Sequence, residues 1–360
     1  MKYSPNKILL IATRQIGDVL LVTPLLRSLR RAYPQTIIDV LVYAHKGGML
    51  EGNPDYNTCI EIAEHPNFNQ YRILLKQILR RYDLAISTLA GDRPLIYALL
   101  AASQRIALVP PKRWQDKWKR LIVQAWTELD NQYTHTIIQN LRLADLLEIP
   151  RHYELIMPQA VNSVEILNEQ LPFAWQNRTF AVLHLLPMWY YKRWTLAGWR
   201  HLIQYLTKTG LPVVITGGGS QLENTYIREV LATAPSMVTN LAGKLRFSDV
   251  AKLIQASTIY VGPDTAVTHL AAATGTPTVA LYGPTNPLKW APWPSNYAKD
   301  KTPFERTGTQ QVGNVLLMRG IGECVPCQQE GCYKHKQSRS HCLEELDSIK
   351  VIEAIEKILL

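Results

Sequence analysis

The densest group of side chains able to do chemistry lies between residues 260 and 277. An apolar strand expected over 258–261 ends in Gly-Pro-Asp-Thr, which brings Asp264 and Thr265 to the start of the next helix. His269 follows one turn later on the same helix face. The first amides of a helix have no internal partners and attract anions. We therefore predict an anion site at this helix start, because capping alone accounts only for Asp264.

A second candidate is the basic pair Lys192 and Arg193, which stands in a run rich in aromatic residues over 187–194. A lysine offers a phosphate a compact charge and an arginine offers a planar fork, so the pair suits phosphate groups. The alternative is a solvated basic pair beside core aromatics, and the residues alone leave both interpretations open.

An acidic residue, Asp18, closes the loop that follows the first expected strand, 7–12. Ligands of open α/β folds bind at the carboxyl ends of the strands, so Asp18 is placed to act as a general base on a hydroxyl. Arg14 and Gln15 of the same loop are candidate contacts for the molecule that carries this hydroxyl. The alternative is a carboxylate that only offsets the positive end of a helix dipole.

The glycines argue against a dinucleotide-binding dehydrogenase. The first loop has only Gly17, and the cluster 217–219 lacks the third glycine of the Gly-x-Gly-x-x-Gly fingerprint. A glycine cluster directly after a strand still lets a nucleotide approach the backbone. Thr216 and Gly217 are therefore candidate nucleotide contacts.

These loops need a scaffold that gathers strand ends. Apolar strands alternate with helical patterns in both halves of the 360-residue chain, and continuous apolar strands suit a parallel sheet covered on both faces. The pattern predicts an α/β protein with two doubly wound domains facing a cleft. We expect domains at 1–155 and 178–345, a linker at 156–177, and a terminal helix at 346–360 that packs back on the first domain.

Together these motifs resemble glycosyltransferase family 9, the bacterial lipopolysaccharide heptosyltransferases. The resemblance rests on the Gly17-Asp18 loop, the run 192–194 and the block 262–277, and it extends over nearly the whole chain. The stretches 189–192 and 240–244 are most similar to the third heptosyltransferase subtype of inner-core assembly. The resemblance implies the GT-B plan of two facing Rossmann-like domains.

The resemblance also implies roles for single residues. Asp18 matches the carboxylate proposed as catalytic base, Lys192 matches the lysine that holds the donor diphosphate, and Glu223 matches the acid that binds the adenosine ribose. One departure is that Pro187 and Met188 stand where the first subtype has hydroxyl residues. The expected donor site comprises Lys192, Arg193, Thr216, Gly217, Glu223, Asp264, Thr265 and His269.

The implied reaction moves heptose from ADP-L-glycero-D-manno-heptose to the inner core of lipopolysaccharide. Inversion by single displacement needs a base for the attacking hydroxyl and stabilisation of the departing diphosphate. No Asp-x-Asp pair occurs in the sequence, so we expect neither a metal clamp nor another cofactor. Another nucleotide-sugar enzyme on the same fold, a transferase of a different sugar or an epimerase, remains the alternative.

The formal net charge of +10 favours an anionic partner. Basic residues interleaved with tryptophans in the amino-terminal half are the candidate acceptor contacts: Lys112, Arg113, Lys117 and Arg120. We expect them to bind phosphorylated lipid A-core and lipid headgroups of the inner leaflet of the inner membrane. An ordinary solvated helix face is the alternative. No recognition-helix motif supports nucleic acid.

Neither a signal peptide nor a run of about 18 apolar residues is recognisable. We therefore expect a cytoplasmic monomer that touches the inner membrane without crossing it. Four cysteines near the carboxyl end, Cys324, Cys327, Cys332 and Cys342, have a first gap suited to zinc but irregular later gaps. A metal site and locally packed thiols both remain open.

Overall fold

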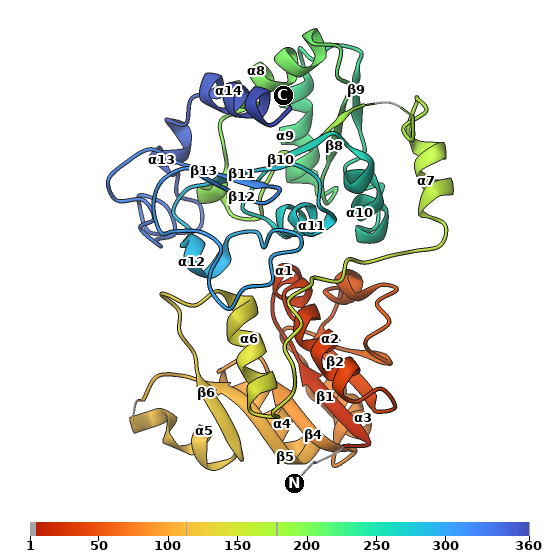
Figure 1. The fold of residues 1–360 in the computed structure, drawn as a ribbon, viewed down its shortest axis with the longest axis vertical. Coiled ribbons are helices and arrows are strands. Elements are labelled where there is room, and N and C mark those ends of the chain that lie inside the picture. Colours follow the sequence, from red (N-terminus) through yellow and green to blue (C-terminus); the bar gives the residue numbers. More distant parts are fainter. Residues whose placement is uncertain (1–4, 113, 178, 360) are drawn as a thin grey trace. The chain divides into compact units, whose positions relative to one another are not determined.

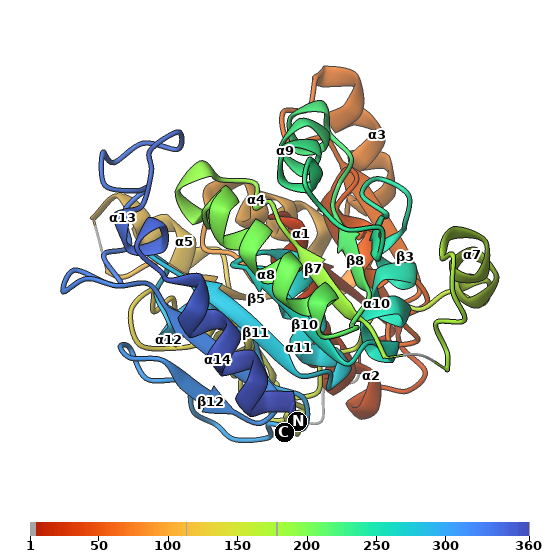
Figure 2. The same ribbon diagram turned by 90° about the horizontal axis from the view of Figure 1, so that it is seen from above.

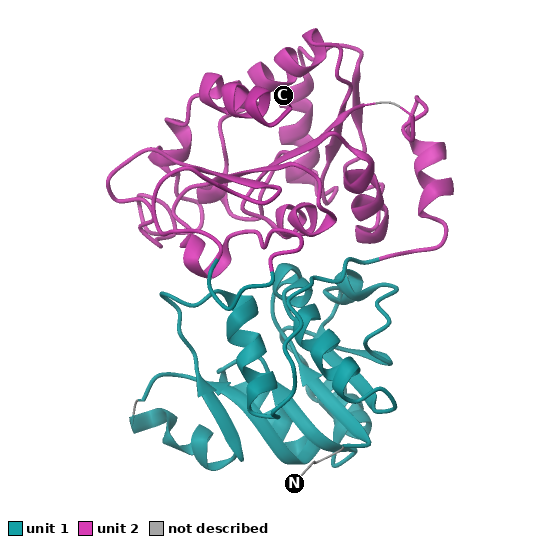
Figure 3. Cartoon of the chain, in the orientation of Figure 1, with its two compact units in different colours: residues 1–158, 298–302 teal, residues 159–297, 303–360 magenta. Residues whose placement is uncertain are grey.

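The computed structural model describes residues 5–112, 114–177 and 179–359 and divides the chain into two compact units (Figure 3). Unit 1 comprises residues 1–158 and 298–302, and unit 2 comprises residues 159–297 and 303–360. Residues 298–302 belong to unit 1, although the residues before and after them belong to unit 2, and the sequence did not predict this. The segment is anchored there by an ion pair between Arg151 and Asp300.

Unit 1 is built on a parallel sheet of six strands within the described residues, in the order β3-β2-β1-β4-β5-β6 (Figure 1). This is the strand order of a Rossmann fold. The strands are β1 (Lys7–Ile11), β2 (Ile37–Tyr43), β3 (Thr58–Ile62), β4 (Tyr82–Ser87), β5 (Ala102–Val109) and β6 (Ala125–Glu128). The helices are α1 (Ile16–Leu20), α2 (Thr23–Ala32), α3 (Phe68–Ile78), α4 (Asp92–Ala101), α5 (Lys117–Leu121) and α6 (Thr136–Asp145), with 3-10 turns η1 (Gly47–Leu50) and η2 (Trp114–Asp116).

The apolar run of β1 explains its central place in this sheet. Ile8 to Ile11 are fully buried, and β1 pairs with β2 on one side and β4 on the other. A strand buried on both faces needs apolar residues at successive positions rather than alternate ones. The loop that carries Asp18 therefore leaves the middle of the sheet.

Unit 2 repeats this arrangement. Its strand order is β12-β13-β11-β10-β7-β8-β9 within the described residues, and only β12 runs antiparallel, at the edge. The strands are β7 (Ala181–His184), β8 (Val213–Thr216), β9 (Val238–Asn240), β10 (Ile259–Pro263), β11 (Thr278–Tyr282), β12 (Gln310–Val312) and β13 (Val315–Arg319). The helices are α7 (Ser163–Gln170), α8 (Leu196–Lys208), α9 (Gln221–Leu231), α10 (Phe247–Ala256), α11 (Ala266–Thr274), α12 (Pro287–Trp290), α13 (His341–Glu344) and α14 (Ser348–Leu359), with the 3-10 turn η3 (Tyr190–Lys192). Two doubly wound α/β units, as predicted from the sequence, are confirmed.

The expected linker contains structure of its own. Helix α7 belongs to unit 2 and packs on α10, where the Ser163 hydroxyl donates to Asp249 Oδ1 at 2.6 Å. A proline-bearing stretch with little periodic pattern was interpreted as a connection, whereas its middle forms a helix held by this buried hydrogen bond.

The terminal helix α14 packs within unit 2, beside α8 (Figure 1, Figure 2). Val351 and Ile355 are fully buried in the same apolar cluster as Trp199, and the Tyr205 hydroxyl donates to Glu356. The expectation that this helix packs on the first domain is therefore corrected, because its apolar face joins the core of unit 2. None of the helices that the structure describes is long and apolar enough to span a bilayer.

Candidate active site

A close ion pair stands at the carboxyl edge of the unit 2 sheet. Lys192 ends the turn η3 that follows β7, and Asp264 directly follows β10. Since β7 and β10 are parallel neighbours, the two loops leave the same edge of the sheet. Lys192 Nζ lies 2.5 Å from Asp264 Oδ2. Both residues were predicted as donor contacts, and the structure brings them together.

Asp264 is ionised although its side chain is only 7% exposed. Burial alone would raise the pKa of this carboxyl, but the charge of Lys192 and hydrogen bonds from Lys192 and Thr285 hold the pKa below its ordinary value. The Thr285 hydroxyl donates to Oδ2 at 2.6 Å. Sequence reasoning missed Thr285, although Gly-Pro-Thr directly after β11 repeats the Gly-Pro-Asp pattern at the end of β10.

Helix α11 begins beside this pair. Thr265 is its N-cap, and the Thr265 hydroxyl accepts a hydrogen bond from the amide of Thr268. His269 lies within the first turns, is 5% exposed, and has no hydrogen-bond partner for Nδ1 among the described residues. Burial lowers the pKa of His269 to about 4, so the ring is neutral at pH 7. A neutral imidazole can exchange a hydrogen bond with a sugar hydroxyl.

The glycine loop after β8 is braced by Glu223. Glu223 Oε2 accepts a hydrogen bond from the amide of Gly218 at 2.8 Å, and Ser220 caps α9 by accepting from the Glu223 amide. A Cβ added to Gly217 would lie 2.6 Å from Glu223 Oε1, so a larger residue would displace the carboxylate. The two predicted residues Gly217 and Glu223 are therefore in contact.

Thr216 ends β8 and is buried against a histidine that sequence reasoning missed. Thr216 Oγ1 lies 3.1 Å from Nδ1 of His184, the last residue of β7. Burial lowers the pKa of His184 to about 4. The Thr216 hydroxyl thus joins two neighbouring strand ends, and its contact with a donor stays a prediction.

Arg193 is held by aromatic rings. Its guanidinium lies 4.4 Å from the ring centroid of Tyr190 and 5.8 Å from that of Tyr226 on α9. Cation–π contacts of this kind orient a guanidinium. The structure therefore gives Arg193 a packing role beside Lys192, and its contact with a diphosphate stays a prediction.

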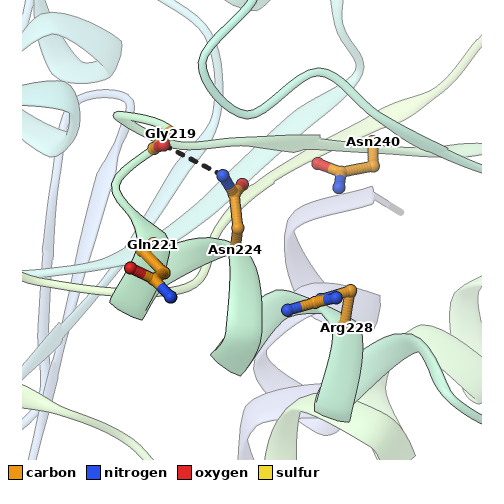
Figure 4. Close-up of a pocket in the computed structure, with 5 residues that line it drawn as sticks. All are labelled: Gly219, Gln221, Asn224, Arg228 and Asn240. Atoms are coloured by element: carbon orange, nitrogen blue, oxygen red, sulfur yellow. Dashed lines mark hydrogen bonds between the residues drawn. The ribbon is translucent and has the colours of Figure 1, made fainter.

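An open pocket of ≈ 530 Å³ lies along α9. Gly219, Gln221, Asn224, Arg228 and Asn240 line it, and Asn224 Nδ2 donates to the Gly219 carbonyl at 2.9 Å (Figure 4). At 3.6 residues per turn, the lining helix residues lie on the face opposite Glu223. This pocket contains none of the predicted donor residues.

In unit 1, Asp18 lies in the short helix α1 that follows β1. Its side chain is 16% exposed, and Oδ1 lies 3.6 Å from Nη1 of Arg14. Gln15 stands at the N-cap position of α1 and makes no capping hydrogen bond through its side chain. The structure thus places Asp18 beside Arg14 at the carboxyl edge of the sheet, and their roles as base and as acceptor contact stay predictions.

The family of this chain is decided by a comparison along its length. The model of glycosyltransferase family 9 (heptosyltransferase) matches residues 71–299. The chain belongs to this family. The resemblance inferred from the motifs is therefore confirmed, and so is the conclusion that the protein is a glycosyltransferase.

Relatives of this family 9 glycosyltransferase agree with the expected subtype. This chain is 28% identical over 293 residues to lipopolysaccharide heptosyltransferase 3 of Escherichia coli strain K12. The aligned region covers 79% of this chain and 84% of the relative. The solved family 9 glycosyltransferase of Veillonella parvula has a TM-score of 0.78 at 18% identity, over 100% of this chain and 98% of that one. The Escherichia coli ADP-heptose lipopolysaccharide heptosyltransferase II has a TM-score of 0.73 at 22% identity, over 98% of both chains. These structures confirm the GT-B fold.

The predicted acceptor cations of the family 9 enzyme differ in their surroundings. Lys112 and Lys117 are exposed, and Lys117 Nζ lies 3.7 Å above the Trp114 ring. The Arg120 side chain is only 12% exposed and donates to the carbonyl of Pro110. Arg120 is therefore less available to an acceptor than the sequence indicates. Arg113 lies outside the described residues.

The cysteine-bearing segment of the enzyme supports two loops of the site. Burial, and then the nearness of the other three thiols, raises the pKa of Cys342 to about 12, and a Cβ on Gly283 would lie 3.2 Å from its Sγ. The neighbouring Ser340 hydroxyl donates to the Tyr191 carbonyl at 2.6 Å. All four cysteines are free, and no group of three or more His, Cys, Asp or Glu side chains in the described parts of the chain is placed to hold a metal ion.

Proposed function

We propose that this glycosyltransferase moves heptose from ADP-L-glycero-D-manno-heptose to the inner core of lipopolysaccharide. The observation that carries the proposal is the Lys192–Asp264 pair beside the start of α11, since it combines a cation, a buried carboxylate and the amino-terminal end of a helix at one sheet edge. The names of the Escherichia coli relatives, a heptosyltransferase 3 and an ADP-heptose transferase, support the same donor and acceptor classes.

The proposed reaction is a single displacement. Asp18 accepts the proton of an acceptor hydroxyl, the oxygen attacks the anomeric carbon, and the bond from that carbon to the diphosphate oxygen breaks. The products are the inverted glycoside and ADP. Lys192 and the first amides of α11 stabilise the charge that develops on the departing diphosphate. Neutral His269 bonds the sugar, and Glu223 holds the nucleotide side of the donor.

The donor assignment is tested by thermal unfolding with ADP, UDP, GDP and their sugars. Ligands that bind only the folded state raise the melting temperature with concentration. We expect stabilisation by ADP and ADP-heptose. Stabilisation by a UDP or GDP sugar alone identifies a transferase of another sugar, and donor isomerisation without acceptor identifies an epimerase. Either result overturns the proposed donor reaction.

We further propose that unit 1 meets an anionic lipid surface through η2 and α5, residues 114–121, together with Lys112. Trp114 is 83% exposed and Leu121 is 84% exposed, and Lys112 and Lys117 are exposed as well. Exposed apolar side chains flanked by lysines suit the boundary between acyl chains and anionic headgroups. In this proposal the protein acts as a cytoplasmic monomer on the inner leaflet of the inner membrane, where a lipid-borne acceptor is presented.

A further inference from the structure

A buried arginine that the predicted donor site does not include lies behind the Lys192–Asp264 pair. Arg319 ends β13 and stands opposite Tyr282 in the parallel pairing of β13 with β11. It is 6% exposed. Its position at the carboxyl end of the strand places it at the same sheet edge as the loops of the site.

The guanidinium of Arg319 makes fewer hydrogen bonds than its donors allow. Nη1 donates to the carbonyl of Thr285 at 3.2 Å, whereas Nε and Nη2 are buried and have no hydrogen-bond partner among the described residues. Within the described chain no carboxylate lies within ion-pair distance of it. A buried cation of this kind is costly unless an opposite charge is supplied.

Burial lowers the pKa of Arg319 to about 10, so the side chain remains charged at pH 7. The titratable groups that face it are Cys342, Tyr282, Asp264 and Arg306, of which only Asp264 is an anion at neutral pH. The carboxylate of Asp264 is already paired with Lys192. Lys192 and Arg319 therefore place two positive charges beside the single carboxylate of Asp264.

Thr285 connects the arginine to the pair. Its carbonyl accepts from Arg319, and its hydroxyl donates to Asp264 Oδ2, the oxygen that faces Lys192. Loss of Arg319 would free the Thr285 carbonyl and remove a positive charge from the low-dielectric side of the site. The free Thr285 carbonyl is a structural effect. The loss of the positive charge weakens the binding of any anion near Lys192.

We propose that Arg319 is a positioning residue for the donor diphosphate: its buried charge is balanced by the bound diphosphate, and its bond to Thr285 holds Thr285 on Asp264. This inference rests on the proposed nucleotide diphosphate donor. Because Nε and Nη2 are shielded from solvent, the charge acts through its field and not through contact with the ligand.

The experiment compares ADP with adenosine, which lacks the diphosphate, by calorimetric titration of the whole chain. For Arg319→Met we expect the Kd of ADP to rise about tenfold and that of adenosine to change less than about twofold. Arg319→Lys keeps the charge without the planar fork, so ADP affinity should return to within about threefold of wild type. Lys350→Met, which removes an exposed cation from α14, is the matched control and should change both affinities less than about twofold.

Equal weakening of ADP and adenosine in Arg319→Met, or unchanged ADP binding, overturns the inference. If Arg319→Met does not fold, Arg319→Lys provides the test. A loss of ADP affinity in Arg319→Lys with retained adenosine affinity would contradict a role of the charge, because this variant keeps the charge. If wild type binds UDP or GDP in place of ADP, the proposed donor fails, and the same comparison of that diphosphate with its nucleoside still tests Arg319.

Discussion

Lys192 Nζ and Asp264 Oδ2 lie 2.5 Å apart, each in a loop after a different strand of the unit 2 sheet. Charge-assisted hydrogen bonds are among the stronger ones in proteins. The pair fixes a flexible lysine side chain at the sheet edge. The Thr285 hydroxyl holds the carboxylate, and Arg319 holds the Thr285 carbonyl. A preorganised cation loses less entropy when a diphosphate binds than a free one does.

Lys192→Met is expected to weaken ADP binding by about 10- to 100-fold, because a hydrogen bond to a charged group contributes about 1.5–3 kcal/mol. Calorimetric titration measures the Kd. Lys208→Met, at the exposed end of α8, is the matched control and should leave the Kd unchanged. Equal ADP affinity in Lys192→Met and wild type would exclude Lys192 from the donor site.

Asp18→Asn should lower kcat by about 10²- to 10⁴-fold, since the amide cannot accept the proton of the acceptor hydroxyl. The KM of the donor should stay within about threefold, because Asp18 is assigned to the acceptor. Steady-state release of ADP in the presence of acceptor measures both constants, and thermal unfolding checks the fold. Near-normal turnover of the variant would remove Asp18 from the role of base.

Two of the buried histidines, His269 and His184, make stability depend on pH. His269 and His184 each have a pKa of about 4 in the folded protein, against an ordinary value of 6.5. The unfolded chain therefore binds protons that the folded chain does not between pH 6.5 and 4, so stability is lost as the pH falls through this window. Each residue contributes a loss of about 2 kcal/mol between pH 7 and 5.

His269→Gln should reduce the loss of stability between pH 7 and pH 5 by about 2 kcal/mol, the contribution of one histidine. Urea unfolding at pH 7 and pH 5 measures the free energy of unfolding at each pH. His65→Gln on the surface of unit 1 serves as the control. An unchanged difference between the two pH values in His269→Gln would contradict a buried neutral ring.

Residues 114–121 of η2 and α5, together with Lys112, should carry binding to anionic vesicles. Replacing Trp114 and Leu121 by Ser removes two exposed apolar side chains and should weaken binding to phosphatidylglycerol vesicles about tenfold or more. Added salt should weaken wild-type binding. Phe68→Ser, at a residue 81% exposed in α3, is the matched control and should have no effect. Salt-insensitive binding, or an equal effect of Phe68→Ser, would contradict this surface.

Local sequence patterns predict much of the scaffold. The continuous apolar residues of β1 and β11 predict buried parallel strands, and Thr265 and Gly275 predict the two ends of α11, which the structure confirms. Asp264 was predicted because it follows a strand, and Lys192 because it stands in a basic pair among aromatic residues. The parallel sheet gathers both at one edge.

Other features depend on long-range packing that no local pattern carries. Thr285 and Arg319 reach the site only because β11 and β13 pair beside β10. The apolar face of α14 is evident in sequence, but its partner α8 is chosen by tertiary fit. Arg120 looked like a free cation among tryptophans, yet its guanidinium is held by a backbone carbonyl.

The central claim is tested most directly by a transfer assay with purified protein, ADP-heptose and a lipid A-core acceptor with an incomplete inner core, followed by mass spectrometry of the acceptor. We predict that the acceptor gains one heptosyl residue, that ADP is released in equal amount, that Asp18→Asn slows the gain by about 10²- to 10⁴-fold, and that Lys192→Met slows it when ADP-heptose is limiting. Transfer from a UDP or GDP sugar instead, or consumption of ADP-heptose without any glycosylated acceptor, would contradict the claim.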